Sequence, residues 1–192
     1  MRIITGKAKG IKLLTLEGEQ TRPTAERTKQ AIFSSLQFDL DGRAVLDLFA
    51  GSGQMGLEAL SRGAVSCMFI DASPEAMAII KENAKNTKLF DQARFLISDY
   101  RSYIRKAGKR DAFSLIILDP PYGMHCVGDA ISRIIDAEIA VPGCIFVCES
   151  GEDNIFEGKE ELQDQFETIK KSRYGVAYVH ILQYKGEDDH AL

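Results

Sequence analysis

The chain has no apolar run close to the roughly 20 residues that a membrane-spanning helix needs. Its first ten residues, MRIITGKAKG, are too polar for a secretory signal, so we expect a cytoplasmic protein. The four cysteines lack paired metal-ligand spacing. Cys144 and Cys148 share an apolar run, and a strand would hold them about 13 Å apart, too far for a disulfide. We therefore expect reduced core thiols and no metal site.

Net charge is low and negative, at −4, which by itself argues against a nucleic-acid partner. The distribution argues the other way, because residues 1–30 hold seven Lys and Arg against three Glu. The 192 residues fit one domain, 1–192, and show no repeat, low-complexity segment or linker. We divide it into an N-terminal extension, 1–38, and a core, 39–192.

Short apolar runs alternate with helix-like segments from residue 44 onward. The runs cover residues 44–49, 66–71, 93–98, 114–119 and 144–149, and the helix-like segments cover 55–63, 73–87, 100–108 and 128–140. This alternation predicts an α/β fold with a mostly parallel sheet and helices on both faces. Residues 164–185 instead read as two strands joined near Gly175. The N-terminal extension reads as two short strands joined through residues 6–10, followed by a helix over 24–38.

Ligands of such sheets bind beyond the carboxyl ends of the strands. Asp47, Asp71, Asp99 and Asp119 each fall at or just past the end of an apolar run, so we expect all four at one rim. Between the first run and its helix, Gly51 and Gly53 predict a sharp turn that lets a ligand approach the backbone.

The glycine turn, Gly51-Ser-Gly53-Gln-Met-Gly56, also fits a dinucleotide-binding pattern, with Asp71 20 residues beyond Gly51. An NAD-dependent oxidoreductase is therefore a competing interpretation. Asp47 weighs against it, because a carboxylate there would repel a pyrophosphate and would suit a cation. S-adenosylmethionine carries a sulfonium, an amino group and no phosphate, so we favour it as the cofactor. Asp71 would accept the ribose hydroxyls and Asp99 the adenine amino group, although either acid could instead cap the helix that follows.

The stretch ILDPPY, residues 117–122, follows the fourth apolar run. Together with VLDLFAGSG it resembles the class I S-adenosylmethionine-dependent methyltransferases that modify amino groups. The resemblance implies catalytic roles for Asp119 and Pro120, whose carboxylate and carbonyl would accept the two N–H bonds of a planar amine and localise its lone pair. Pro120 and Pro121 would stiffen the loop, and Tyr122 would stack on the base.

The motif alone leaves adenine N6, cytosine N4, guanine N2 and a protein glutamine amide open. The segments GKAKGIKLL, TRPTAERTKQAIFSSL, DLFAGSGQMGLEALSRGA and YGVAYVHIL make nearly the whole chain similar to the RsmD family, bacterial enzymes that methylate guanine N2 in small-subunit (16S) ribosomal RNA. That family has a seven-stranded sheet whose last strand is antiparallel and no separate RNA-binding domain.

The RsmD resemblance implies that Arg22, Pro23 and Thr24 form a lip over the methionine end of the cofactor. The substrate would be ribosomal RNA or an assembling small subunit, and we expect a monomer. A guanine inside a helix would have to flip out to reach Tyr122. Contacts to flanking phosphates are expected from Lys7, Lys9, Lys12, Arg27 and Lys29, with Pro121 beside the substrate.

Overall fold

The computed structural model describes residues 1–16, 23–36, 39–108 and 111–186. It divides into two compact units, Met1–Tyr100 and Arg101–Leu192, which we describe separately. Whether they act as the single predicted domain stays a prediction. Within the described residues, none of the helices combines the length and the apolar character needed to cross a bilayer.

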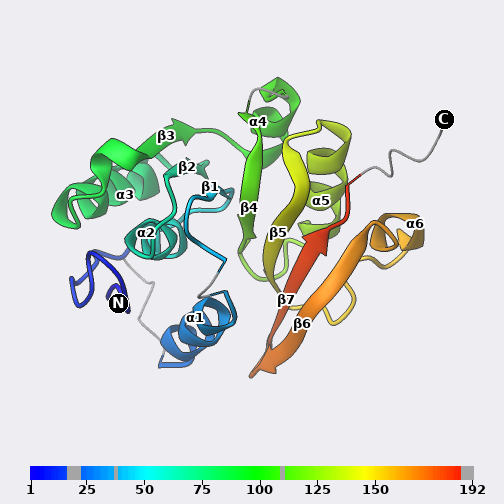
Figure 1. Cartoon of the computed structure of the whole chain (residues 1–192), viewed down its shortest axis with the longest axis horizontal. Coiled ribbons are helices and arrows are strands. Elements are labelled where there is room, and N and C mark those ends of the chain that lie inside the picture. The colour runs from blue at the N-terminus through cyan, green and yellow to red at the C-terminus, as the bar shows by residue number, and fades with distance from the viewer. Residues whose placement is uncertain (17–22, 37–38, 109–110, 187–192) are drawn as a thin grey trace. The chain divides into compact units, whose positions relative to one another are not determined.

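The first unit holds a parallel sheet with strand order β3-β2-β1 (Figure 1). Its elements are α1 (Pro23–Ser35), β1 (Ala44–Asp47), α2 (Gln54–Ser61), β2 (Ser66–Asp71), α3 (Pro74–Asn86), the short 3-10 helix η1 (Phe90–Gln92) and β3 (Ala93–Ile97). Helix α2 packs on β1 and β2, and α3 packs on β2 and β3. Helix α3 begins where the sequence dictates, because Ser73 caps it by accepting from the N–H of Ala76 and Pro74 starts its first turn.

The second unit holds strands in the order β4-β5-β7-β6. Its elements are α4 (Tyr100–Lys106), which starts at the last residue of the first unit, β4 (Phe113–Leu118), α5 (Val127–Asp136), β5 (Ala140–Ser150), α6 (Glu160–Gln163), β6 (Phe166–Tyr174) and β7 (Ala177–Tyr184). Strands β4 and β5 are parallel, whereas β7 runs antiparallel to both β5 and β6. The predicted C-terminal hairpin is confirmed, with a turn at Gly175, which has a φ of 63°.

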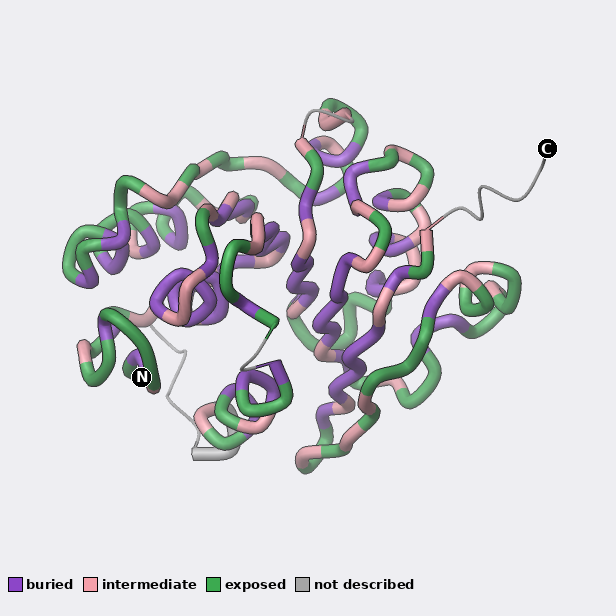
Figure 2. Tube along the Cα trace, in the orientation of Figure 1, coloured by how far each residue is buried: buried purple, intermediate pink, exposed green. Residues whose placement is uncertain are grey.

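The core of the second unit follows the sequence pattern. Val127, Ala130, Ile131 and Ile134 line one face of α5 and are buried, as a helical repeat of apolar residues requires. Strands β4 and β5 are mostly buried along their length, while β6, on the edge of the sheet, is mostly exposed (Figure 2). The cysteines are buried free thiols, Cys67 in the first unit and Cys126, Cys144 and Cys148 in the second, as expected of core thiols.

The N-terminal segment departs from prediction. The expected pair of strands is reduced to a single antiparallel bridge between Arg2 and Lys12. Ile3 and Leu13 donate their N–H groups to the carbonyls of Ile11 and Met1, and the chain reverses direction between them. We call residues 1–16 the N-terminal arm.

Candidate functional site

The glycine turn lies between β1 and α2 in the first unit. Gly51 and Gly53 have φ angles of 53° and 76°, the left-handed region that glycine adopts most readily. A Cβ at Gly53 would also lie 3.0 Å from Cγ2 of Ile80. The predicted sharp turn is therefore present, and it requires glycine at Gly53 for both reasons.

Asp71, the last residue of β2, holds the edge of this turn. Its Oδ2 accepts the N–H of Gly51 at 2.8 Å, and its Oδ1 accepts the N–H of Ser73 at 2.8 Å. The alternative role of Asp71, as the cap of the following helix, is filled by Ser73, whose hydroxyl caps α3. Asp71 is half-buried beside the glycine backbone, where a ligand held by that backbone would meet it. Contact with a ribose stays a prediction.

Asp47 ends β1 and is covered, with 1% of its surface exposed. Its Oδ2 accepts the N–H of Gly56 at 3.0 Å, which ties α2 to β1. Burial raises the pKa of Asp47 to about 7; the Gly56 hydrogen bond opposes this rise, and the charge of Asp71 adds to it. The carboxylate therefore carries a structural role in the first unit, and its contact with a cofactor cation stays a prediction.

Three of the predicted rim acids share the carboxyl edge of the sheet in the first unit. Asp47 pairs in register with Phe69, and Asp71 lies two residues beyond Phe69 on the same strand. Asp71 in turn pairs with Ile97, and Asp99 lies two residues beyond Ile97. Asp99 is exposed. The rule that parallel strands gather their C-terminal residues at one edge holds for these three acids.

Two predicted cofactor residues lie at the edge of what the structure describes. Arg22 falls outside the described residues. The backbone of Thr24 belongs to the first turn of α1, and its side chain falls outside the description. The lip over the cofactor stays a prediction.

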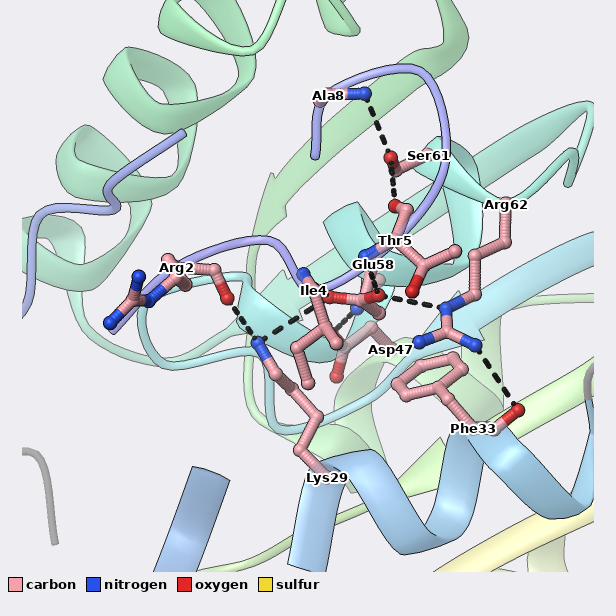
Figure 3. A network of polar contacts seen from close by, with 11 residues as sticks. Arg2, Ile4, Thr5, Ala8, Lys29, Phe33, Asp47, Glu58, Ser61 and Arg62 are labelled. Atoms are coloured by element: carbon pink, nitrogen blue, oxygen red, sulfur yellow. Dashed lines mark hydrogen bonds and ion pairs between the residues drawn. The ribbon is translucent and has the colours of Figure 1, made fainter. Parts of the chain in front are cut away.

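The N-terminal arm is docked on α2 through two buried side chains (Figure 3). Glu58 accepts the N–H groups of Ile4 and Thr5 at 2.8 and 3.1 Å. The hydroxyl of Ser61 donates to the carbonyl of Thr5 at 2.6 Å and accepts from the N–H of Ala8 at 2.9 Å. These bonds fix the backbone that carries the arm's basic residues, and Arg2, Lys7, Lys9 and Lys12 are all exposed on it.

Asn83, on α3, links the end of the arm to the glycine turn. Its Oδ1 accepts the N–H of Leu14 at 2.8 Å, and its Nδ2 donates to the carbonyls of Leu14 at 3.0 Å and Ser52 at 2.9 Å. Asn83 is fully buried. Sequence reasoning missed Glu58 and Asn83. Glu58 is the one charged residue in the apolar stretch GLEAL, whereas Asn83 lies in the polar stretch KENAKN, where nothing in the sequence marks it.

The prediction that Lys29 contacts phosphate is wrong. Lys29 is only 2% exposed, and its Nζ donates to the carbonyl of Arg2 at 2.7 Å and lies 3.5 Å from Oε2 of Glu58 (Figure 3). Burial lowers the pKa of Lys29, and the charge of Glu58 acts against that fall. A cation committed to a buried carboxylate is not available to RNA. Arg27, two residues earlier on α1, is exposed.

The DPPY loop follows β4 in the second unit. Pro120 is buried and Pro121 is exposed. The loop turns at Gly123, which has a φ of 86°, and the N–H of Met124 donates to the carbonyl of Pro121 at 3.2 Å. A buried proline followed by a closed turn fixes the backbone just after Asp119.

Tyr122 projects from this loop with 57% of its surface exposed. Its hydroxyl donates to Oε1 of Glu149 at 2.7 Å. Burial raises the pKa of Glu149, and the bond from Tyr122 acts in the opposite direction. A small pocket beside the ring is lined in part by His125 and Glu152, which interact through Nδ1 and Oε1 at 2.7 Å. Among the described residues, no group of three or more His, Cys, Asp or Glu could hold a metal ion.

A family model, "Conserved hypothetical protein 95", matches residues 1–183. The chain belongs to this family. The YlbH protein of Bacillus subtilis is 35% identical over 97% of this chain and 100% of its own length. The Haemophilus influenzae protein named "Ribosomal RNA small subunit methyltransferase D" is 30% identical over 80% of each chain. The predicted membership of the RsmD family is confirmed.

Solved structures show the fold. The yhhF protein of Escherichia coli matches with a TM-score of 0.84 and 24% identity, over 96% of this chain and 98% of that one. SMU.776, solved in complex with S-adenosylhomocysteine (SAH), matches with a TM-score of 0.67 and 14% identity over 81% of this chain and 49% of its own. The described residues supply seven strands, mostly parallel with antiparallel strands at the end, and the predicted class I methyltransferase fold is confirmed.

Proposed function

We propose that this chain transfers a methyl group from S-adenosylmethionine to the exocyclic N2 amine of a guanine in small-subunit ribosomal RNA. Membership of the RsmD family carries this proposal, since the Haemophilus influenzae relative is named for that RNA. The glycine turn with its carboxylates and the DPPY loop are the two local features that the chemistry needs.

The donor set of the first unit fits the cofactor. Gly51 and Gly53 place no side chain at two positions of the turn, and Asp71 is fixed at its edge by the N–H of Gly51. Asp71 would bind the ribose hydroxyls and Asp99 the adenine amine, with Asp47 beneath the turn. An acid at Asp71 suits the ribose of either cofactor. Asp47, when ionised, would repel a pyrophosphate as a like charge, so it favours S-adenosylmethionine over NAD.

The acceptor chemistry falls to the DPPY loop. S-adenosylmethionine supplies an electrophilic methyl group. An exocyclic amine is a weak nucleophile because its lone pair is shared with the ring. Asp119 and the carbonyl of Pro120 would accept its two N–H bonds and direct the lone pair at the methyl carbon, so that the N–C bond forms as the C–S bond breaks. The methylated ammonium is acidic and loses its proton afterwards, so no base with a raised pKa is needed.

The RNA would be held mainly by charge. The N-terminal arm has Arg2, Lys7, Lys9 and Lys12 and no acidic residue, and its backbone is fixed on α2 and α3. With Arg27, these exposed cations would bind phosphates that flank the guanine. The exposed ring of Tyr122 would stack on the flipped base, a contact worth about 1–3 kcal/mol.

A labelling experiment tests the proposal. The protein is incubated with methyl-labelled S-adenosylmethionine and, in separate reactions, ribosomal RNA and small subunits from cells that lack it, plasmid DNA, and whole-cell protein. We expect label in RNA or small subunits, at guanine N2. Label confined to DNA or protein would refute the proposed substrate.

Asp119→Ala should keep SAH affinity and lose methyl transfer, and an active variant would refute the acceptor role of Asp119.

The competing oxidoreductase is tested by calorimetry. SAH should bind the protein, and NAD should not. Tight NAD binding with no response to SAH would overturn the methyltransferase assignment.

The proposed location is the cytoplasm, where ribosomal RNA is found, and fractionation of cells checks it.

A further inference from the structure

The side chain of Tyr122, the aromatic residue of the DPPY loop, is held by a hydrogen bond from its hydroxyl. Tyr122 is more than half exposed, yet its hydroxyl donates to Oε1 of Glu149 at 2.7 Å. An exposed aromatic side chain held by its polar tip presents its ring in one orientation, and the oxygen-to-carboxylate bond that holds it belongs to the stronger class of hydrogen bonds.

Glu149 makes a rigid anchor because its backbone belongs to β5 and is paired with β7. Leu118 and Cys148 are register partners in β4 and β5, so Asp119 and Glu149 occupy equivalent positions at the ends of neighbouring parallel strands. On the other side, Glu149 pairs with Val179 of β7. The carboxylate therefore projects from backbone that is paired in the sheet, next to the strand that delivers Asp119.

The rest of the loop fixes the backbone of Tyr122. Pro120 is buried, Gly123 closes the turn, and the N–H of Met124 donates to the carbonyl of Pro121. Beside the ring lies Gly151, where even an added Cβ would stay 3.9 Å from Cδ1 of Tyr122. With a glycine as this neighbour, the bond to Glu149 helps to set the angle of the ring.

We propose that Glu149 is a positioning residue that acts through the hydroxyl of Tyr122 and presets the ring as the stacking surface for the acceptor base. This role rests on the proposed function. A ring that is ordered before the base arrives spares the complex the side-chain entropy of ordering it on binding. Glu149 thereby contributes to the capture of the base without touching it.

The test compares Tyr122→Phe, Glu149→Ala, Glu149→Gln and the double variant Tyr122→Phe/Glu149→Ala. The measurements are kcat and KM for small-subunit RNA, SAH affinity and unfolding temperature. We expect Tyr122→Phe and Glu149→Ala each to raise KM for RNA about fivefold to tenfold, with SAH affinity unchanged. The double variant should be no worse than either single variant. Glu149→Gln retains an acceptor oxygen, so its KM for RNA should lie close to that of the wild type.

Glu152→Ala is the matched control, because Glu152 lines a pocket with Tyr122 and its Oε1 interacts with Nδ1 of His125. It should leave KM for RNA unchanged. Any of three results would overturn the role of Glu149. These are additive increases of KM in the double variant, a KM for Glu149→Gln as high as that of Glu149→Ala, or increases of KM that follow a fall in unfolding temperature. Wild-type protein that labels no RNA would overturn the proposed function itself, whereas an active wild type with additive losses would overturn only the role of Glu149.

Discussion

The Nζ of Lys29 lies 3.5 Å from Oε2 of Glu58, and both side chains are almost fully buried. Glu58 also accepts from Ile4, Thr5 and the guanidinium of Arg62, the last at 2.7 Å (Figure 3). One carboxylate on α2 thus joins α1 and the N-terminal arm to the helix that follows the glycine turn.

Removal of Glu58 should be far more costly than removal of Lys29. Glu58→Ala leaves an ammonium buried without its carboxylate, and we expect a loss of about 3–5 kcal/mol in the free energy of unfolding. Lys29→Met leaves Glu58 with three other donors and should cost less. Urea unfolding measures both.

The pair can be tested for coupling. Lys29→Met added to Glu58→Ala removes the unpaired charge and should recover part of the stability, so the two effects should not add. Additive losses would contradict the view that the two buried charges depend on each other.

Gly6 and Gly10 provide a matched pair in the N-terminal arm. Both have positive φ angles, 87° and 85°. A Cβ at Gly6 would lie 1.8 Å from the carbonyl oxygen of Ser61, whereas a Cβ at Gly10 would meet nothing within 4 Å. Gly10→Ala should therefore cost only the backbone strain, about 1 kcal/mol, while Gly6→Ala must also push the arm away from α2.

Hydrogen exchange reads this difference directly. In Gly6→Ala, the amides of Ile4, Thr5 and Ala8, which bond Glu58 and Ser61, should lose protection, and affinity for RNA should fall. In Gly10→Ala, protection and affinity should stay near those of the wild type. Equal behaviour of the two variants would show that close packing against Ser61 does not hold the arm.

The sequence predicted the features that depend on local pattern. The glycine turn, the acids at strand ends and the hairpin at Gly175 are each set by residues close together in the chain. Glu58 and Asn83 could not be recognised in this way, because their partners are backbone groups 54 and 69 residues away. Lys29 was misread for the same reason: the sequence counts its charge but does not show that α1 turns it inward to Glu58.

Asp47 should make stability depend on pH. Its pKa in the folded state is about 7, against an ordinary value of 3.8, so the folded protein keeps a proton that the unfolded chain releases. The free energy of unfolding should therefore fall as pH rises from about 4 to 7, by roughly 3–4 kcal/mol from this group. Asp47→Asn keeps an acceptor for the N–H of Gly56 and removes the titration.

Urea unfolding from pH 5 to pH 8 checks this. The stability of Asp47→Asn relative to wild type should increase with pH across that range. Asp91→Asn, at an exposed position, should follow the wild type throughout. A constant difference between Asp47→Asn and wild type would contradict the titration of Asp47 in this window.

Replacement of Asp71 should weaken binding of the cofactor. Asp71→Ala removes both the proposed ribose acceptor and the oxygen that fixes the N–H of Gly51, so we expect SAH affinity to fall about tenfold to a hundredfold. Asp71→Asn keeps one carbonyl oxygen for Gly51 and should lose less. The contrast between Asp71→Ala and Asp119→Ala is the sharper measurement. Calorimetry should find weakened SAH binding only in Asp71→Ala, and unchanged affinity there would remove Asp71 from the cofactor site.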